Sequence, residues 1–272
     1  MVKLRGKIKI MRWLRLLNII LLVFIIAVVF YIGSARETTV SYDYWIRNAQ
    51  ELDNDKFLPT PKSPPERGIS EEGNEIILLD VPFTSQAPFG EWHDPRQQDG
   101  CEEATSLMVV YWAQGKTLDK QIAKQEILAA SEYQKEKYGE YRDTSATTTA
   151  QRIIKEYFNY DNFEVKQASS SQDIIVELLT GHVVITPMNG QALGNPYYTA
   201  PGPERHMLLI RGYDFTTQEF ITNDNGTRNG EEYRYKQDVL FKAIRDYPSG
   251  YHVPIEGMRK VMIVVEQSRA DN

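Results

Sequence analysis

The sequence contains a single cysteine among its 272 residues, so no disulfide can form within the chain and stability must come from a hydrophobic core. Apolar residues make up 42% of the chain, which is enough to build such a core. The chain also lacks a basic stripe beyond its N-terminus, and its net charge of -6 argues against a general nucleic-acid-binding protein. It shows no internal repeat. These absences indicate one main folded domain whose lone thiol needs its own explanation.

The N-terminus combines basic residues with a long apolar run. Six basic residues occur before any acidic one: Lys3, Arg5, Lys7, Lys9, Arg12 and Arg15. The run Leu16–Gly33 has about the length needed to cross a bilayer and exceeds the ~7–15 residues of a signal-peptide core. We therefore predict a cytoplasmic segment over residues 1–15, one transmembrane helix over 16–33, and a single-pass cell-membrane protein whose remainder is extracytoplasmic. Gly33-Ser34-Ala35 also fits a cleavage site, and cleavage there would give a secreted protein.

A proline-rich stretch separates this run from the folded domain. Residues 56–74 are dense in Pro, Glu, Ser and Gly, and four prolines keep the stretch extended: Pro59, Pro61, Pro64 and Pro65. We therefore predict an extracytoplasmic linker over residues 34–75 and a folded domain over residues 76–267.

Within this domain, helical patterns give way to strand patterns. Helices are predicted over residues 101–115, 118–132, 147–158, 171–179 and 237–245. Strands are predicted over residues 76–80, 163–167, 182–186, 206–213, 219–222, 232–235 and 260–265. The charged, tyrosine-rich segment 133–143 is predicted to be a solvated segment. Because the later strands follow one another too closely for helical crossovers, the sequence indicates an antiparallel sheet and the α+β class.

Cys101 falls at the first turn of the helix predicted over residues 101–115. The N-terminus of a helix favours thiolate over thiol, which is one way to make a cysteine nucleophilic at neutral pH. The alternative is a small buried side chain without chemistry.

A nucleophilic cysteine needs a base, and four histidines are candidates. His206 opens a strongly apolar predicted strand, and His182 also begins a strand. His93 and His252 lie in predicted loops, where surface or structural roles are expected. Spacing alone does not choose among them.

The turn Asn223-Asp224-Asn225-Gly226 follows His206 at the spacing of a β-hairpin. Two antiparallel strands would bring the end of one beside the start of the other, which places Asp224 or Asn223 next to His206. The same four residues are also ordinary turn sequence.

These residues occur within an ordered set of blocks that resembles family thirty-nine of the cysteine peptidases, whose domains are related to those that process bacteriocin leader peptides. The blocks are Val81-Pro82-Phe83, Gln86-Ala87-Pro88, Trp92, Cys101-Glu102-Glu103-Ala104, Gly212-Tyr213-Asp214 after His206, and Asn223-Asp224. The resemblance covers about residues 76–265. It implies a papain-like cysteine peptidase fold, in which the helix bearing the cysteine packs on an antiparallel sheet, here preceded by the predicted transmembrane helix.

The resemblance also implies roles for four residues. Cys101 would be the nucleophile, His206 the general base and then acid, and Asp224 the residue that orients His206. The amide of Gln86, with the backbone N–H of Cys101, would donate to the developing oxyanion, and its alternative role is a loop-fixing hydrogen bond.

Glu102 and Glu103 match the family pattern as well. A carboxylate beside a thiolate opposes its ionisation, so these residues are expected to be structural or substrate-facing.

We therefore expect a membrane-anchored, extracytoplasmic cysteine peptidase that cleaves amide bonds through a Cys-His-Asp triad and an acyl-enzyme. The resemblance implies no metal and no cofactor. The expected partners are a peptide or protein substrate and, through the N-terminal span, the membrane. Two alternatives stay open: a cell-wall peptide hydrolase with the same triad, and a non-catalytic peptide-binding domain. The presence of all four proposed site residues weighs against the second.

Overall fold

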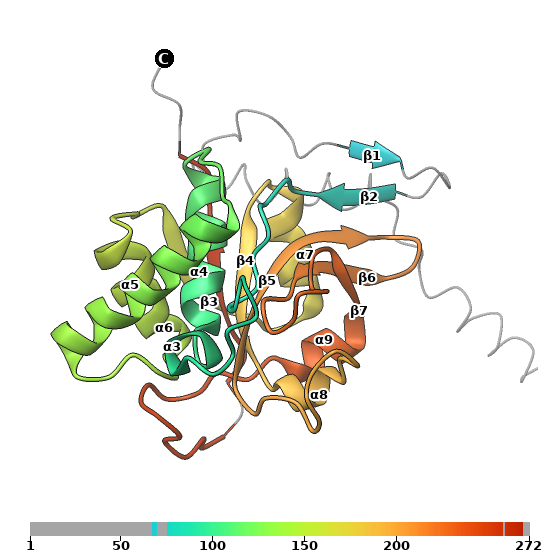
Figure 1. Cartoon of the computed structure of the whole chain (residues 1–272). Helices are drawn as coiled ribbons and strands as arrows, with labels where there is room; N and C mark the ends of the chain where they lie inside the picture. The colour runs from blue at the N-terminus through green and yellow to red at the C-terminus, as the bar shows by residue number, and fades with distance from the viewer. Residues whose placement is uncertain (1–66, 70–74, 258, 269–272) are drawn as a thin grey trace, which may run out of the picture. The chain divides into compact units, whose positions relative to one another are not determined.

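The computed structural model describes residues 67–69, 75–257 and 259–268 (Figure 1). The predicted cytoplasmic segment, the predicted transmembrane helix and most of the predicted linker lie outside the described residues. Residues 67–69, within the range predicted as linker, form a short strand. Within the described ranges, none of the helices is long and apolar enough to cross a membrane.

The described strands form one antiparallel sheet. In chain order they are β1 (Arg67–Ile69), β2 (Glu75–Leu78), β3 (Phe163–Gln167), β4 (Val183–Met188), β5 (His206–Asp214), β6 (Glu219–Asn223), β7 (Tyr233–Lys236) and β8 (Val261–Val265). Their order in the sheet is β1-β2-β5-β4-β8-β3, and β6 pairs with both β5 and β7. Every pair of these strands is antiparallel, which confirms the sheet type that the strand spacing predicts.

β5 pairs with three other strands. β6 runs along one edge of β5, with Leu209 opposite Asn223, while β4 and β2 follow each other along the other edge. Gly212 permits the contact with β2, because a Cβ at this position would lie 2.4 Å from the carbonyl oxygen of Ile77. All nine residues of β5 are buried, so both of its faces are covered.

The described helices are α3 (Pro95–Gln98), α4 (Cys101–Ala113), α5 (Lys120–Tyr138), α6 (Ala146–Thr149), the π-helical segment η1 (Ala150–Tyr157), α7 (Ser171–Leu179), α8 (Gly190–Leu193) and α9 (Gln237–Ala243). Both α4 and α7 pack against β5, and α5 and η1 pack against α4. Figure 1 shows β4 and β5 between α4 and α7. The domain is therefore a mixed helix and antiparallel-sheet fold, with the core on both sides of β5.

One predicted segment differs from the structure. The sequence predicts a solvated segment over residues 133–143, but α5 continues through Tyr138 and ends where Gly139 adopts a φ of 80°. The extension buries Gln134, whose Nε2 donates to Oε1 of Glu103 at 2.7 Å. The extension of α5 shows no apolar helical pattern in the sequence, because its buried residue Gln134 packs against a polar partner, Glu103.

Candidate active site

Cys101 is the first residue of α4. The preceding Gly100 is required at this point, because a Cβ there would lie 2.4 Å from the carbonyl oxygen of Arg96 in α3. All 13 residues of α4 are buried, and Cys101 itself is 8% exposed. The thiol is therefore fixed at the start of a core helix, with only a small part of its surface open to solvent.

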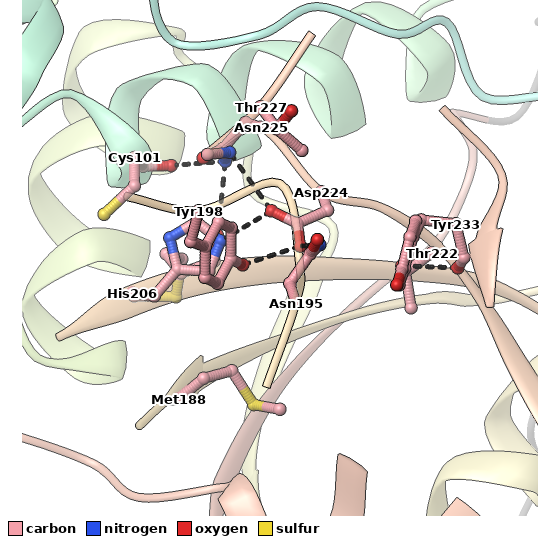
Figure 2. A network of polar contacts seen from close by, with 12 residues as sticks. Cys101, Met188, Asn195, Tyr198, His206, Thr222, Asp224, Asn225, Thr227 and Tyr233 are labelled. Atoms are coloured by element: carbon pink, nitrogen blue, oxygen red, sulfur yellow. Dashed lines mark hydrogen bonds and ion pairs between the residues drawn. The ribbon is translucent and has the colours of Figure 1, made fainter. Parts of the chain in front are cut away.

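Asn225 ties the first turn of α4 to the start of β5. Its Nδ2 lies 3.0 Å from the carbonyl oxygen of Cys101, 2.6 Å from Oγ1 of Thr105 and 3.2 Å from the carbonyl oxygen of Met207. Thr105 donates to the same Met207 carbonyl at 3.1 Å. Figure 2 shows Asn225 beside Cys101, with the contact between them dashed. The contacts hold Cys101 near the backbone that carries His206.

His206 and Asp224 form a buried pair. Nε2 of His206 lies 2.9 Å from Oδ1 of Asp224, and their side chains are 2% and 0% exposed. The antiparallel pairing of β5 and β6 places Asp224, which follows the end of β6, close to the start of β5. Nε2 of His206 therefore carries the proton that faces the carboxylate, and Nδ1 is left with its lone pair.

The carboxylate of Asp224 receives further donors on its second oxygen. The hydroxyls of Tyr198 and Tyr235 each lie 2.6 Å from Oδ2, and Nδ2 of Asn195 lies 3.0 Å from it. The backbone N–H of Gly226 donates to Oδ1 at 3.1 Å. Figure 2 shows Asn195 and Tyr198 directed at this carboxylate.

These donors decide the charge of the pair. Burial by itself raises the pKa of Asp224, but the contact with His206 and the hydrogen bonds from both tyrosines outweigh burial and lower that pKa. The ring of Tyr198 also meets the imidazole edge to face, with centroids 5.6 Å apart. Asp224 is therefore held ionised, and the His206 ring is fixed in position.

The Cys101 thiol makes a different contact. Its Sγ donates to Oε2 of Glu102 at 2.9 Å, and in the described part of the chain no hydrogen bond joins it to His206. Burial raises the pKa of the Cys101 thiol, and the Glu102 carboxylate raises it further, against a smaller opposing effect of the Met207 backbone N–H. The thiol is therefore protonated in this arrangement.

Two buried carboxyl groups follow Cys101 on α4. Oε1 of Glu102 accepts from the hydroxyl of Tyr247 at 2.8 Å and from the backbone N–H of Thr144 at 3.1 Å. Burial raises the pKa of Glu102 above its ordinary value, and the hydrogen bonds from Cys101 and Tyr247 offset this rise only in part. Burial also raises the pKa of Glu103, whose Oε2 makes no hydrogen bond to a described residue.

Gln86 lies against the end of α3. Its Nε2 donates to the carbonyl oxygens of Gln97 at 3.0 Å and Gln98 at 2.7 Å, and its backbone N–H donates to the carbonyl of Asn225 at 2.9 Å. Both acceptors are carbonyls, so the amide nitrogen must face them. The two N–H groups of the amide therefore make the loop-fixing bonds that were the alternative expectation for Gln86.

The structure distinguishes Asp224 from its neighbour Asn223, which the sequence left open. Nδ2 of Asn223 donates to the carbonyls of Val81 and Pro82 at 3.1 and 3.2 Å, so this side chain anchors the loop after β2. Asp224 is the residue that contacts His206.

The other three histidines have different surroundings. Nδ1 of His182 lies 2.8 Å from Glu177, and the backbone N–H of His252 donates to Asp143. His93 lies in the loop before α3. In the described residues, no group of three or more His, Cys, Asp or Glu side chains could hold a metal ion.

Sequence reasoning missed the side chains that complete the site: Asn195, Tyr198, Tyr235, Tyr247 and the contact role of Asn225. Tyrosine is common in this chain, with 16 examples, so the residue type alone marks nothing. The usable signal is position. Tyr198 lies in the proline-containing loop directly before His206, and Asn225 belongs to the same turn as Asp224.

The fold and the site define a mixed helix and antiparallel-sheet protein with one buried cysteine near a histidine–aspartate pair. Residues 78–249 match the model of the Peptidase_C39 like family, and because this match covers more than half of the chain, the protein belongs to that family. A comparison with curated proteins gave no match.

Solved structures with some similarity share 15% sequence identity with the chain. One is described as a C39-like peptidase from Bacillus anthracis, with a TM-score of 0.45 over 72% of this chain and 100% of that one. Another is Xylellain, a cysteine protease from Xylella fastidiosa, with a TM-score of 0.40 over 77% of this chain and 91% of that one.

Proposed function

We propose that the chain is a papain-like cysteine peptidase, with Cys101 as nucleophile, His206 as general base and acid, and Asp224 as the residue that orients His206. The observation that carries this proposal is the buried His206–Asp224 pair, held near the helix start that bears the only cysteine. A histidine bound to a carboxylate through one ring nitrogen keeps its other nitrogen for the thiol proton.

In the proposed reaction, Nδ1 of His206 takes the proton from Sγ of Cys101, and the sulfur attacks the carbonyl carbon of an amide. The S–C bond forms, and negative charge moves to the carbonyl oxygen. His206 then returns the proton to the leaving nitrogen as the C–N bond breaks, which leaves a thioester. Water, deprotonated by His206, attacks this acyl-enzyme, and the acid and the free thiol are released.

The oxyanion needs donors, and we propose the backbone N–H of Cys101 and the amide of Gln86. The Gln86 amide is supported by its place at the end of α3, directly before the start of α4. Because both of its N–H groups already donate to backbone carbonyls, the substrate oxygen must replace one of these bonds. The proposed route uses no metal or cofactor.

We propose that this peptidase acts outside the cell membrane on a peptide or protein substrate. The support is the basic segment 1–15 followed by the apolar run 16–33, which favours a span with the N-terminus inside. In this proposal the linker 34–75 spaces the domain 76–267 from the membrane. Cleavage after the apolar run would release the same domain.

The test combines alkylation by iodoacetamide with cleavage of a peptide library by the full-length chain in detergent. Cys101 is the only cysteine, so every alkylated molecule reports on this residue. We expect Cys101→Ala to abolish cleavage with little change in Tm, because the side chain is small and the nucleophile carries the whole covalent route. We expect His206→Ala to slow alkylation at neutral pH by ~10-fold or more, because the base is lost.

The contrary outcomes are distinct. Peptide cleavage by Cys101→Ala at the wild-type rate would exclude a thiol mechanism. Binding of library peptides without any cleavage by the wild type, and equal alkylation of wild type and His206→Ala, would identify a non-catalytic peptide-binding domain.

A further inference from the structure

The Glu102 carboxylate is surrounded by hydrogen-bond donors. Oε2 faces the thiol of Cys101 at 2.9 Å, and Oε1 faces the hydroxyl of Tyr247 at 2.8 Å and the backbone N–H of Thr144 at 3.1 Å. The side chain is 1% exposed, so water does not compete for these bonds. Three donors directed at one carboxyl group fit its ionised form, which accepts at both oxygens.

Glu103 offers an internal comparison on the same turn of α4. It is 0% exposed, but its Oε1 accepts from Nε2 of Gln134 at 2.7 Å and it makes no hydrogen bond to Cys101. Two adjacent carboxyl groups of the same type and burial therefore differ in one respect that matters for the thiol. Only Glu102 touches the sulfur.

We propose that Glu102 is a positioning residue that holds the Cys101 thiol protonated and away from His206 in the resting protein, so that the nucleophile forms only when this bond is broken. The inference rests on the proposed function for its role in turnover. The part of the inference that concerns the Glu102 carboxylate keeping the Cys101 thiol protonated does not depend on any peptide substrate.

The physical reason is charge. Loss of the thiol proton next to an ionised carboxylate would place two negative charges about one hydrogen-bond length apart in a water-poor site. The Cys101 proton is therefore retained until the sulfur turns toward the His206 ring. Other groups act on this pair: Glu103 and Asp143 oppose a further negative charge, and Tyr247 donates to Glu102.

The proposal is tested by measuring the rate of iodoacetamide alkylation against pH for the full-length chain. The variants are Glu102→Gln, which keeps shape and removes charge, and Glu103→Gln as the matched control. We expect Glu102→Gln to lower the pH midpoint of alkylation by about one unit and to raise the rate at pH 7 roughly tenfold. Glu103→Gln is expected to shift the midpoint much less.

A double variant tests where the released thiol goes. Adding His206→Ala to Glu102→Gln is expected to remove most of the gain in rate, because the sulfur no longer has a base. Equal midpoints in the wild type and Glu102→Gln would overturn the proposal, and a slower rate in Glu102→Gln would make Glu102 an activating base instead. Faster alkylation in Glu102→Gln without cleavage of any peptide by the wild type would leave this inference standing and remove the peptidase.

A second measurement needs no variant and covers the case in which Glu102→Gln fails to fold. The S–H stretching band of the single thiol, followed by Raman spectroscopy in the wild type, is expected to be present at pH 7. Its absence at pH 7, with the protein folded, would show a thiolate at rest and overturn the proposal.

Discussion

The candidate site has two halves: the proposed base half, which is His206 with Asp224, and the proposed nucleophile half, which is Cys101 with Glu102 and Glu103. The two halves differ in how completely their polar groups are hydrogen-bonded. At the base half, Asp224 accepts five hydrogen bonds, one of them from His206, and its pKa is lowered despite complete burial. At the nucleophile half, the Cys101 thiol faces Glu102, and burial together with this carboxylate raises the thiol pKa. The surroundings of Asp224 therefore favour its ionised form, whereas the surroundings of Cys101 favour the protonated thiol.

This difference follows from the cost of burying a carboxylate, which is large unless its oxygens have donors. The donors to Asp224 come from four places: the loop between α8 and β5, β5 itself, the turn that follows β6, and β7. Around Glu103 one oxygen lacks a partner among the described residues. The fold therefore holds the His206–Asp224 pair with many hydrogen bonds and leaves the thiol bonded to Glu102, an arrangement that must change before catalysis under the proposed function.

The largest effect in this comparison is expected from Asp224→Asn. Three donors face Oδ2 of Asp224, so the amide oxygen of the variant must take that position and its N–H₂ group must face His206. An N–H directed at Nε2 forces the ring proton onto Nδ1, which then has no lone pair for the thiol proton. We expect kcat/KM for peptide cleavage to fall by about 10²–10⁴ with the protein still folded.

The control for this variant is Asp214→Asn. Asp214 is also buried on β5 and accepts from Arg234 at 2.8 Å, but it lies at the other end of the strand. The Asp214→Asn variant is expected to have a lower Tm and a kcat/KM within a few-fold of the wild type. Similar losses of activity in both variants would mean that Asp224 acts only on stability.

The sequence predicts the backbone of the base half because that geometry is local. Two strands at hairpin spacing bring the start of β5 beside the turn after β6, so the pairing of His206 with Asp224 or Asn223 follows from strand order. The choice between these two depends on which side chain points inward. That is set by the Val81 and Pro82 carbonyls, which bind Asn223 and lie far from it in the chain.

The nucleophile half is predicted less well because its contacts are not local. The helix start at Cys101 follows from apolar periodicity, but the bond between Glu102 and Tyr247 joins residues 145 positions apart. The pairing of Glu103 with Gln134 also depends on packing between α4 and α5, and the polar composition around Gln134 hid the extension of α5. Buried polar pairs leave no periodic signal in a sequence, so these contacts need the structure.

A smaller effect is expected from Gln86→Ala, which tests whether the Gln86 amide donates a hydrogen bond to the oxyanion. If the amide serves the transition state, kcat falls by about 10²–10³ with KM little changed. We expect this result, because the amide lies directly before the helix start that carries the Cys101 N–H. A lower Tm with kcat within tenfold of the wild type would instead assign Gln86 to loop fixing alone.

The smallest effect is expected from Glu103→Gln, and it depends on pH. Burial raises the pKa of Glu103 in the folded protein, so folded chains retain a proton that unfolded chains release as the pH rises above about 4.3. The stability present below that pH is therefore lost as the pH rises toward the raised pKa. Glu103→Gln removes this loss, because a glutamine amide does not titrate. We expect its Tm to exceed that of the wild type at pH 7 by ~2–4 °C for each kcal/mol regained and to be nearly equal at pH 4. Thermal unfolding followed by circular dichroism measures both, and an equal gain at the two pH values would show that titration of Glu103 is not the cause.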